Sequence, residues 1–166
     1  MFRIMIDPGH GGGDPGAVGN GLREKDLTLD ISKRIRRILE NEFDATVYMT
    51  RETDVFVELG ERADIANKAG VDFFLSVHIN AGGGTGFETY RHPNASAKTK
   101  SVQDVLHKAV VSALGSDVKD RGLKTKNLAV LRLTKMPAVL TEVLFIDNPN
   151  DARLLKDEAF REKVAR

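Results

Sequence analysis

The sequence contains no cysteine, so it can form neither a disulfide nor a thiolate metal site, and any bound metal must be held by histidines and carboxylates. Long hydrophobic runs are also missing, because none approaches the roughly 20 residues that span a bilayer. We therefore expect no membrane insertion. The opening stretch MFRIMID reaches Asp7 at once and is not a secretory signal. The chain is thus expected to act without export by its own signal, or to be a mature or excised domain.

An excess of one sign of charge is missing too. The formal net charge is +1, which is too balanced to suggest a nucleic-acid partner. Residues 95–135 are locally basic, with nine Lys or Arg against three Asp, but such even spacing is more typical of a solvated face. The length of 166 residues, with 41% apolar and 30% charged residues, fits one soluble globular domain.

Hydrophobic periodicity divides the chain into alternating strands and helices. Strands are expected over residues 2–6, 45–50, 72–80, 86–90, 128–133 and 138–145, and helices over residues 25–42, 57–70, 96–114 and 150–165. The segment 7–24 holds seven glycines and two prolines and predicts a long loop, which in a compact domain is usually functional. The alternation favours an α/β layered domain with a largely parallel sheet.

Three unusual polar residues occupy equivalent places in this pattern. His10 follows the first strand, His78 ends the third, and Glu142 lies late in the last strand, within the apolar run AVLTEVLFI. Functional residues of parallel sheets gather beyond the carboxyl ends of the strands. An isolated buried carboxylate is so costly that it normally neutralises or finds a partner, so Glu142 needs a reason to be there.

The glycine loop formally matches the dinucleotide fingerprint G-x-G-x-x-G at Gly11, Gly13 and Gly16. Arg51, after the second strand, could even suggest a 2′-phosphate partner. The fingerprint requires the loop to open directly into a helix whose N-terminus meets the pyrophosphate. Here Pro15 falls inside the match and the helical pattern begins well after it. We therefore reject nucleotide binding.

A metal site accounts for the pattern better. Catalytic zinc commonly has three protein ligands and one open position, and His10, Glu24 and His78 supply such a set. Each has an ordinary explanation when taken alone: Glu24, for instance, suits the first turn of a helix, where the helix dipole favours an acid. Their coincidence with Glu142 favours one Zn²⁺ per chain. No H-E-x-x-H helix occurs, so this is not that class of metalloprotease.

Glu142 then has a chemical role. A buried carboxylate beside zinc can take a proton from the attacking water and hand it to a leaving amine. The alternative is a buried ion pair, for which Arg62 is the candidate partner. Asp7 could orient His10, although it would serve equally well in a strand-end turn. Asn80, two residues beyond His78, could hydrogen-bond substrate.

The sequence context of the two remaining histidines predicts that both lie on the surface. His107 falls next to Lys108 in an expected helix, and His92 lies in the polar segment YRHPN. His92 could also line the rim of a cleft.

Taken together, the sequence resembles the zinc-dependent N-acetylmuramoyl-L-alanine amidases, which cleave bacterial peptidoglycan. The stretches that carry the resemblance are collinear with the family and cover nearly the whole chain: IMIDPGHGGGDPGA (4–17), REKDLTLDIS (23–32), VYMTRETD (47–54), LGERADIAN (59–67), FLSVHINA (74–81), GFETY (86–90), RGLKTKNLAVLR (121–132) and PAVLTEVLFIDNPNDARLL (137–155).

The resemblance implies roles for four residues and a fold. His10, Glu24 and His78 would be the zinc ligands and Glu142 the catalytic carboxylate. The fold would be a twisted, mostly parallel sheet of about six strands, flanked by helices on both faces. The substrate would be the amide between the lactyl group of N-acetylmuramic acid and L-alanine of the stem peptide.

Two departures from the family pattern stand out. The family usually has Glu-x-Gly-Phe where this chain has Glu142-Val143-Leu144-Phe145, so Leu144 adds bulk where the backbone or the substrate passes. The last helix also ends sooner than is usual. We expect residues 1–166 to be the catalytic portion of a longer hydrolase, such as a phage lysin or an autolysin, acting as a monomer at the cell wall or outside the cell.

Two other functions remain open. A zinc carboxypeptidase could use the same ligand set, but would need an Arg to hold a terminal carboxylate. A wall-binding module could keep the fold, with Leu144 blocking catalysis.

Overall fold

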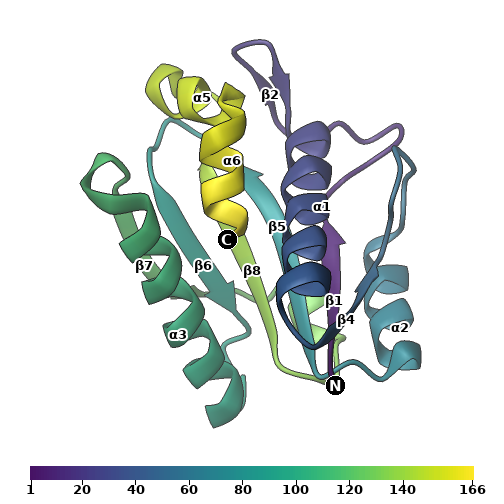
Figure 1. Cartoon of the computed structure of the whole chain (residues 1–166). Coiled ribbons are helices and arrows are strands. Elements are labelled where there is room, and N and C mark those ends of the chain that lie inside the picture. Colours follow the sequence, from purple (N-terminus) through teal and green to yellow (C-terminus); the bar gives the residue numbers. More distant parts are fainter.

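A computed structural model describes all 166 residues, and it has one six-stranded sheet covered by helices on both faces (Figure 1). The order across the sheet is β4-β1-β5-β8-β6-β7. Every neighbouring pair is parallel except β6 and β8, which are antiparallel. The strands of this sheet are β1 (Phe2–Pro8), β4 (Ala45–Met49), β5 (Phe73–Asn80), β6 (Phe87–Arg91), β7 (Asp120–Thr125) and β8 (Ala138–Phe145), and the short strands β2 (Val18–Gly19) and β3 (Leu22–Arg23) form a separate antiparallel pair. The predicted single-domain α/β fold is confirmed.

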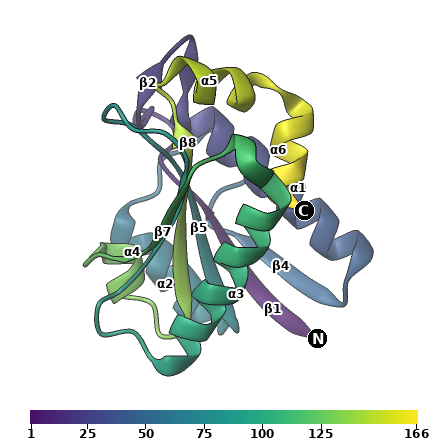
Figure 2. The same ribbon diagram turned by 90° about the vertical axis from the view of Figure 1, so that its left-hand side faces the viewer.

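The helices divide between the two faces of the sheet, as the turned view shows (Figure 2). They are α1 (Glu24–Glu42), α2 (Leu59–Ala69), α3 (Ala97–Leu114), the short 3₁₀ turn η1 (Gly115–Asp117), α4 (Ala129–Arg132), α5 (Pro149–Lys156) and α6 (Glu158–Ala165). Helices α1, α3, α5 and α6 contribute to a core of 18 buried apolar residues or pack against it. Helices α2 and α4 form a smaller core of eight on the opposite face. None of the helices combines the length and the apolar character needed to cross a bilayer.

Side-chain alternation along the central strands explains how both faces are filled. In β5, Phe74 belongs to the smaller core, while its neighbours Phe73 and Leu75 belong to the larger one. A strand buried on both sides must be apolar at successive positions, which is why 72–80 has a nearly continuous hydrophobic run. In α1, Leu27 and Ile31 recur at helical spacing on the buried side.

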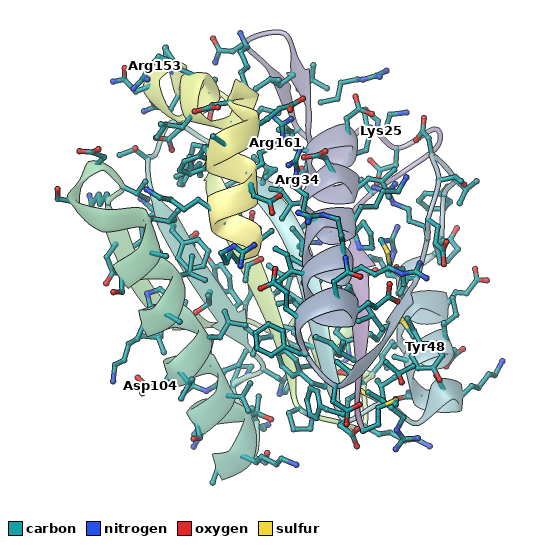
Figure 3. The ribbon with its side chains drawn as sticks, in the orientation of Figure 1. Lys25, Arg34, Tyr48, Asp104, Arg153 and Arg161 are labelled. Carbon is teal, nitrogen blue, oxygen red and sulfur yellow. The ribbon has the colours of Figure 1, made fainter.

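The helix α6 is fixed to α1 by charged side chains. Asp30 accepts hydrogen bonds from Arg34 (Nε, 2.8 Å) and from Arg161 (Nε, 2.6 Å). Arg34 also donates to Glu162 at 3.1 Å. Figure 3 shows Arg34 and Arg161 in the space between the two helices. The C-terminal helix is therefore fixed beside the middle of α1, the chain's longest helix.

Two predicted elements were wrong, and one strand was missed. The segment 128–133 is not a strand, because it forms the short helix α4, in which the adjacent residues Val130 and Leu131 are both buried in the same core. The edge strand β7 was missed, since its sequence DRGLKT has no apolar alternation. The helix expected over 150–165 is two helices, because Asp157 accepts a hydrogen bond from the N–H of Ala159 and begins α6 anew.

Candidate metal and catalytic site

The three residues predicted to bind zinc lie together at the carboxyl end of the central strands. Glu24 Oε1 is 3.1 Å from His10 Nε2 and 3.1 Å from His78 Nδ1. One potential ligand atom from each residue lies within 4.8 Å of the other two. Ligand atoms about 2.0–2.2 Å from a tetrahedral ion would lie roughly 3.3 Å apart, so this spacing suits a small cation.

The surrounding loop is shaped closely around these side chains. A Cβ atom on Gly9 would lie 2.4 Å from Cε1 of His78, and one on Gly16 would lie 2.6 Å from Oε2 of Glu24. His10 itself has a φ of 61°, in the left-handed region that few side chains adopt. The glycines therefore allow the backbone to pass close to the cluster, and strain is tolerated at a candidate ligand.

The charges of the cluster favour a cation at its centre. Although burial alone would lower the pKa of His10, the carboxylates of Glu24 and Asp14 outweigh it and raise that pKa to about 9. Burial likewise opposes ionisation of Glu24, but hydrogen bonds from His10 and His78 hold its pKa well below the usual range. The site thus stabilises positive charge between its ligands.

Asp14, rather than Asp7, orients His10. Asp14 Oδ2 lies 2.8 Å from His10 Nδ1, which leaves Nε2 directed at Glu24. A carboxylate on the second ring nitrogen is the usual way of fixing a metal-binding histidine. The signal in the sequence was the spacing of four residues between His10 and Asp14 inside one glycine loop, and sequence reasoning missed it.

Asp7 instead pairs with Arg62, and this overturns two interpretations. Both side chains are almost fully buried, and Arg62 Nη1 donates to Asp7 Oδ1 at 2.9 Å. Arg62 also donates to the carbonyl oxygens of Pro8 and His10. Arg62 is therefore not the partner of Glu142, and the ion pair fixes the backbone that carries His10.

Arg51 also fixes the backbone of this loop by hydrogen bonds. Its guanidinium donates to the carbonyl oxygens of Pro8, Gly9 and Lys25 at 2.9–3.1 Å. The side chain is buried. It is thus committed to the backbone between β1 and α1, which agrees with the rejection of a phosphate-binding role.

Glu142 lies directly beside the cluster. In the parallel pairing of β5 with β8 it is the partner of His78. Its Oε2 is buried and has no hydrogen-bond partner, whereas buried polar atoms are normally paired. Burial raises the pKa of Glu142 to about 7, against the opposing effect of His78. A carboxyl group with such a pKa can both accept and release a proton near neutral pH.

A cavity of about 280 Å³ opens beside the two histidines. It is lined by His10 and His78 on one side and by Phe56 and Leu59 on the other. Phe56 and Leu59 are exposed, although they are apolar. The cluster is thus reached from solvent through a cleft with an apolar wall.

Asn80 is held by protein groups. Its Nδ2 donates to Oε1 of Glu88 at 2.7 Å, and its Oδ1 accepts from the N–H of Ala81 at 3.0 Å. Glu88 is 2% exposed and also binds Arg121 and Lys124. This buried acid was missed, because GFETY carries no sign that Glu88 faces inward.

The other two histidines lie outside the site, and the expectation for His107 needs correction. His107 is not a surface residue: it is buried, with Thr89 Oγ1 at 3.0 Å from Nδ1 and Asp120 Oδ1 at 2.8 Å from Nε2. His92 lines a polar cavity with Met136 and Pro137, at the opposite end of β8 from Glu142, and so cannot border the catalytic cleft.

Leu144 lies in the core. It is fully buried within the larger apolar cluster and has a φ of 65°. The left-handed backbone explains why glycine suits this position. The side chain packs in the larger apolar core and does not project into the cleft.

Comparison with known proteins agrees with this geometry. The family model described as N-acetylmuramoyl-L-alanine amidase matches residues 4–166. The chain is 50% identical over its whole length to the sporulation-specific N-acetylmuramoyl-L-alanine amidase of Bacillus subtilis strain 168, and 51% identical over 98% of its length to the endolysin of Bacillus phage SPP1. It covers 65% and 61% of these two relatives, and so spans less than two thirds of their length.

Solved structures share the same fold. An N-acetylmuramoyl-L-alanine amidase from Clostridium difficile 630 superposes with a TM-score of 0.94 at 33% identity, covering 99% of this chain and 90% of that one. The catalytic domain of CwlV, an N-acetylmuramoyl-L-alanine amidase from Bacillus (Paenibacillus) polymyxa var. colistinus, gives 0.93 at 36% identity, covering 99% and 92%.

Proposed function

This chain belongs to the N-acetylmuramoyl-L-alanine amidase family, and from that premise we propose that it hydrolyses the amide between N-acetylmuramic acid and L-alanine in peptidoglycan with the help of one zinc ion. The observation that carries the proposal is the placement of Glu142, with its unpartnered buried oxygen, directly beside the His10–Glu24–His78 cluster.

The donor set fits zinc. Two imidazoles and one carboxylate, with a solvent-open side at the cavity, match catalytic zinc sites, which keep a position free of protein ligands. When bound, zinc would polarise the scissile carbonyl and lower the pKa of a coordinated water. His10, Glu24 and His78 would hold the ion, and Asp14 would keep Nε2 of His10 directed toward it.

Glu142 performs the proton transfers in this proposal. Its Oε2 accepts a proton from the attacking water as the water's oxygen bonds to the carbonyl carbon. The same carboxyl group then gives that proton to the alanine nitrogen as the C–N bond breaks. Burial raises the pKa of Glu142 to about 7, which allows the group to act in both directions, and a bound cation would oppose this effect and lower the pKa.

The setting of the reaction follows from the family. We propose that the chain is the catalytic portion of a longer hydrolase and acts as a monomer on the cell wall, as an autolysin or a phage lysin would. Support comes from a relative named an endolysin, of which this chain matches only a part. Asn80, at the end of β5 beside the site, is proposed to contact substrate from its fixed position.

The decisive experiment uses purified sacculi and mass spectrometry. The zinc-loaded protein should release stem peptides that begin with a free L-alanine, and a chelator should abolish the release. Glu142→Gln keeps the shape of the side chain but removes its basicity, so we expect turnover to fall by about 10²–10⁴-fold while one zinc per chain is retained. Metal content would be measured in parallel.

Glu40→Gln, a change of the same kind on the exposed side of α1, is the matched control and should leave turnover unchanged. Full activity of Glu142→Gln would contradict the assignment. Release of single amino acids instead of intact peptides would indicate a carboxypeptidase.

A further inference from the structure

A row of polar side chains runs from the candidate metal cluster across three neighbouring strands, β5, β8 and β6. Glu142 pairs with His78 on one side and with Glu88 on the other. Directly paired residues of neighbouring strands point to the same face of a sheet. The three side chains therefore share the face that α2 and α4 cover farther along the strands.

Glu88 gathers four donors at the end of this row. Its Oε1 accepts from Asn80 at 2.7 Å and from the hydroxyl of Tyr90 at 3.0 Å. Its Oε2 accepts from Arg121 Nε at 2.8 Å and from the ammonium group of Lys124. One carboxylate thus fixes side chains from β5, β6 and β7. Such a buried, fully bonded group keeps its neighbours in place.

Arg121 and Lys124 keep charge and hydrogen-bond donors that Glu88 does not pair. Two cations face one anion, which leaves an excess charge of +1 beside the row. Arg121 donates through Nε and Nη1, while its Nη2 donates to no protein atom. The side chains of Arg121 and Lys124 are 25% and 36% exposed. Donors with a fixed position and an open side can bind a further anion.

Arg121 is also held in its orientation by an aromatic ring. Its guanidinium carbon lies 4.7 Å from the centre of the Phe145 ring, three residues after Glu142. A guanidinium stacked on a ring and bonded to Glu88 loses little further freedom on binding a ligand. Surface arginines seldom have two such restraints.

We propose that Arg121 and Lys124 form a subsite for a carboxylate of the substrate's peptide portion. The inference rests on the proposed amidase function, because it takes the cleaved amide to lie at Glu142. Glu88 acts as a positioning residue that fixes both cations beside the strand position paired with Glu142.

The dimensions of the sheet identify which carboxylate is bound. Neighbouring strands lie about 4.8 Å apart, so Glu88, whose carboxylate the guanidinium contacts at 2.8 Å, is roughly one strand spacing from Glu142. An extended peptide advances about 3.3–3.6 Å per residue. The second residue of the stem peptide, a glutamate whose α-carboxyl group is either free or amidated, is therefore the one within reach.

The test is a calorimetric titration with two peptides, which does not depend on catalysis. The peptides are L-alanyl-γ-D-glutamyl-L-lysine and the same peptide with the glutamyl α-carboxyl group as an amide. We expect the zinc-loaded protein to bind the free carboxylate about tenfold more tightly, the effect of one charge-assisted hydrogen bond. Arg121→Gln should reduce this preference to about twofold or less, and Arg121→Lys, which keeps the charge but loses the planar guanidinium and its stacking on Phe145, should retain only part of it.

Arg36→Gln is the matched control, because it removes the same guanidinium from the outer side of α1. Lys124→Gln gives a second and more exposed variant in case Arg121→Gln unfolds, and thermal melts would show whether each variant is folded. Equal binding of the two peptides by the unaltered protein, no binding of either, or an unchanged preference in both variants would overturn the subsite.

Hydrolysis of sacculi is measured separately. Release of peptides without a carboxylate preference would reject the subsite and keep the amidase. A carboxylate preference without any release would support the subsite and reject the amidase function.

Discussion

The hydrogen-bond and ion-pair partners of each charged side chain show which residues can take part in the candidate site. Glu142 has a buried oxygen without a partner, and Glu24 is the one carboxylate within reach of both His10 and His78. Arg62, the obvious neutralising partner for Glu142, is already committed to Asp7. Removing one member of such a buried pair would leave an uncompensated charge, which usually costs about 3–5 kcal/mol. Glu142 is thus left without a neutralising partner, as the proposed proton-transfer role requires.

Leu144 gives a prediction at the same scale. At a φ of 65°, Ala and Leu are both strained, whereas Gly is not. Leu144→Ala should lower the free energy of unfolding by about 2–5 kcal/mol through lost packing. Leu144→Gly loses the same packing but relieves a strain of about 1 kcal/mol, so it should be the more stable of the two. Urea denaturation measures both.

Leu140, a core residue of the same strand without a positive φ, provides the control. There the usual order should hold, with the Ala variant more stable than the Gly variant. Leu144→Ala proving more stable than Leu144→Gly would show that the left-handed backbone carries no strain. Neither Leu144 variant should change kcat/KM, because the side chain packs in the core.

Among the elements, those with a strong apolar pattern were predicted and those built on polar contacts were not. The buried strands β1, β5 and β8 and the helix α1 follow from periodicity alone. The strand β7 could not be found, because its side chains face polar partners: Asp120 meets His107, and Arg121 and Lys124 meet Glu88. Such contacts are long-range and leave no period in the sequence. The candidate ligand trio was predicted from where His10, Glu24 and His78 stand relative to the expected strands and helix, whereas Asp14 was missed as the orienting group although it is only four residues from His10.

The Glu88 network predicts how strands β5, β6 and β7 respond to acid. Although burial opposes it, hydrogen bonds from Lys124, Arg121 and Tyr90 hold the pKa of Glu88 below its usual value of 4.5. A carboxyl group with a lower pKa in the folded state binds its proton more readily in the unfolded state, so its contribution is complete above about pH 4.5 and is lost as pH falls through the folded pKa.

The stability of Glu88→Gln is the measurement that tests this. The difference in unfolding free energy between the unaltered protein and Glu88→Gln should be large at about pH 6 and should shrink toward about pH 3. Glu40→Gln, with its exposed carboxyl group, should show no comparable change. A difference that stays constant with pH would mean that the ionised Glu88 does not hold the strands together.

At the scale of the whole molecule, the candidate metal cluster joins segments that are distant in sequence. His10 comes from the loop after β1, Glu24 begins α1, and His78 lies near the end of β5. The loop between β1 and α1 has little regular structure of its own and is held by Arg51, Arg62 and the cluster. A cation bound by all three ligands would therefore stabilise the folded chain as a unit.

Removal of the metal should accordingly lower the melting temperature of the whole domain. A ligand present at about 1,000 times its Kd stabilises by roughly 4 kcal/mol, and each kcal/mol shifts Tm by about 2–4 °C in a domain of this size. We expect a chelator to lower Tm by roughly 10 °C, and added zinc to restore it. His10→Ala should show almost no response to zinc, whereas His92→Ala, altered in the cavity at the opposite end of β8, should respond like the unaltered protein. Differential scanning calorimetry with and without zinc separates the cases, and an equal zinc response in His10→Ala would exclude His10 from the ligand set.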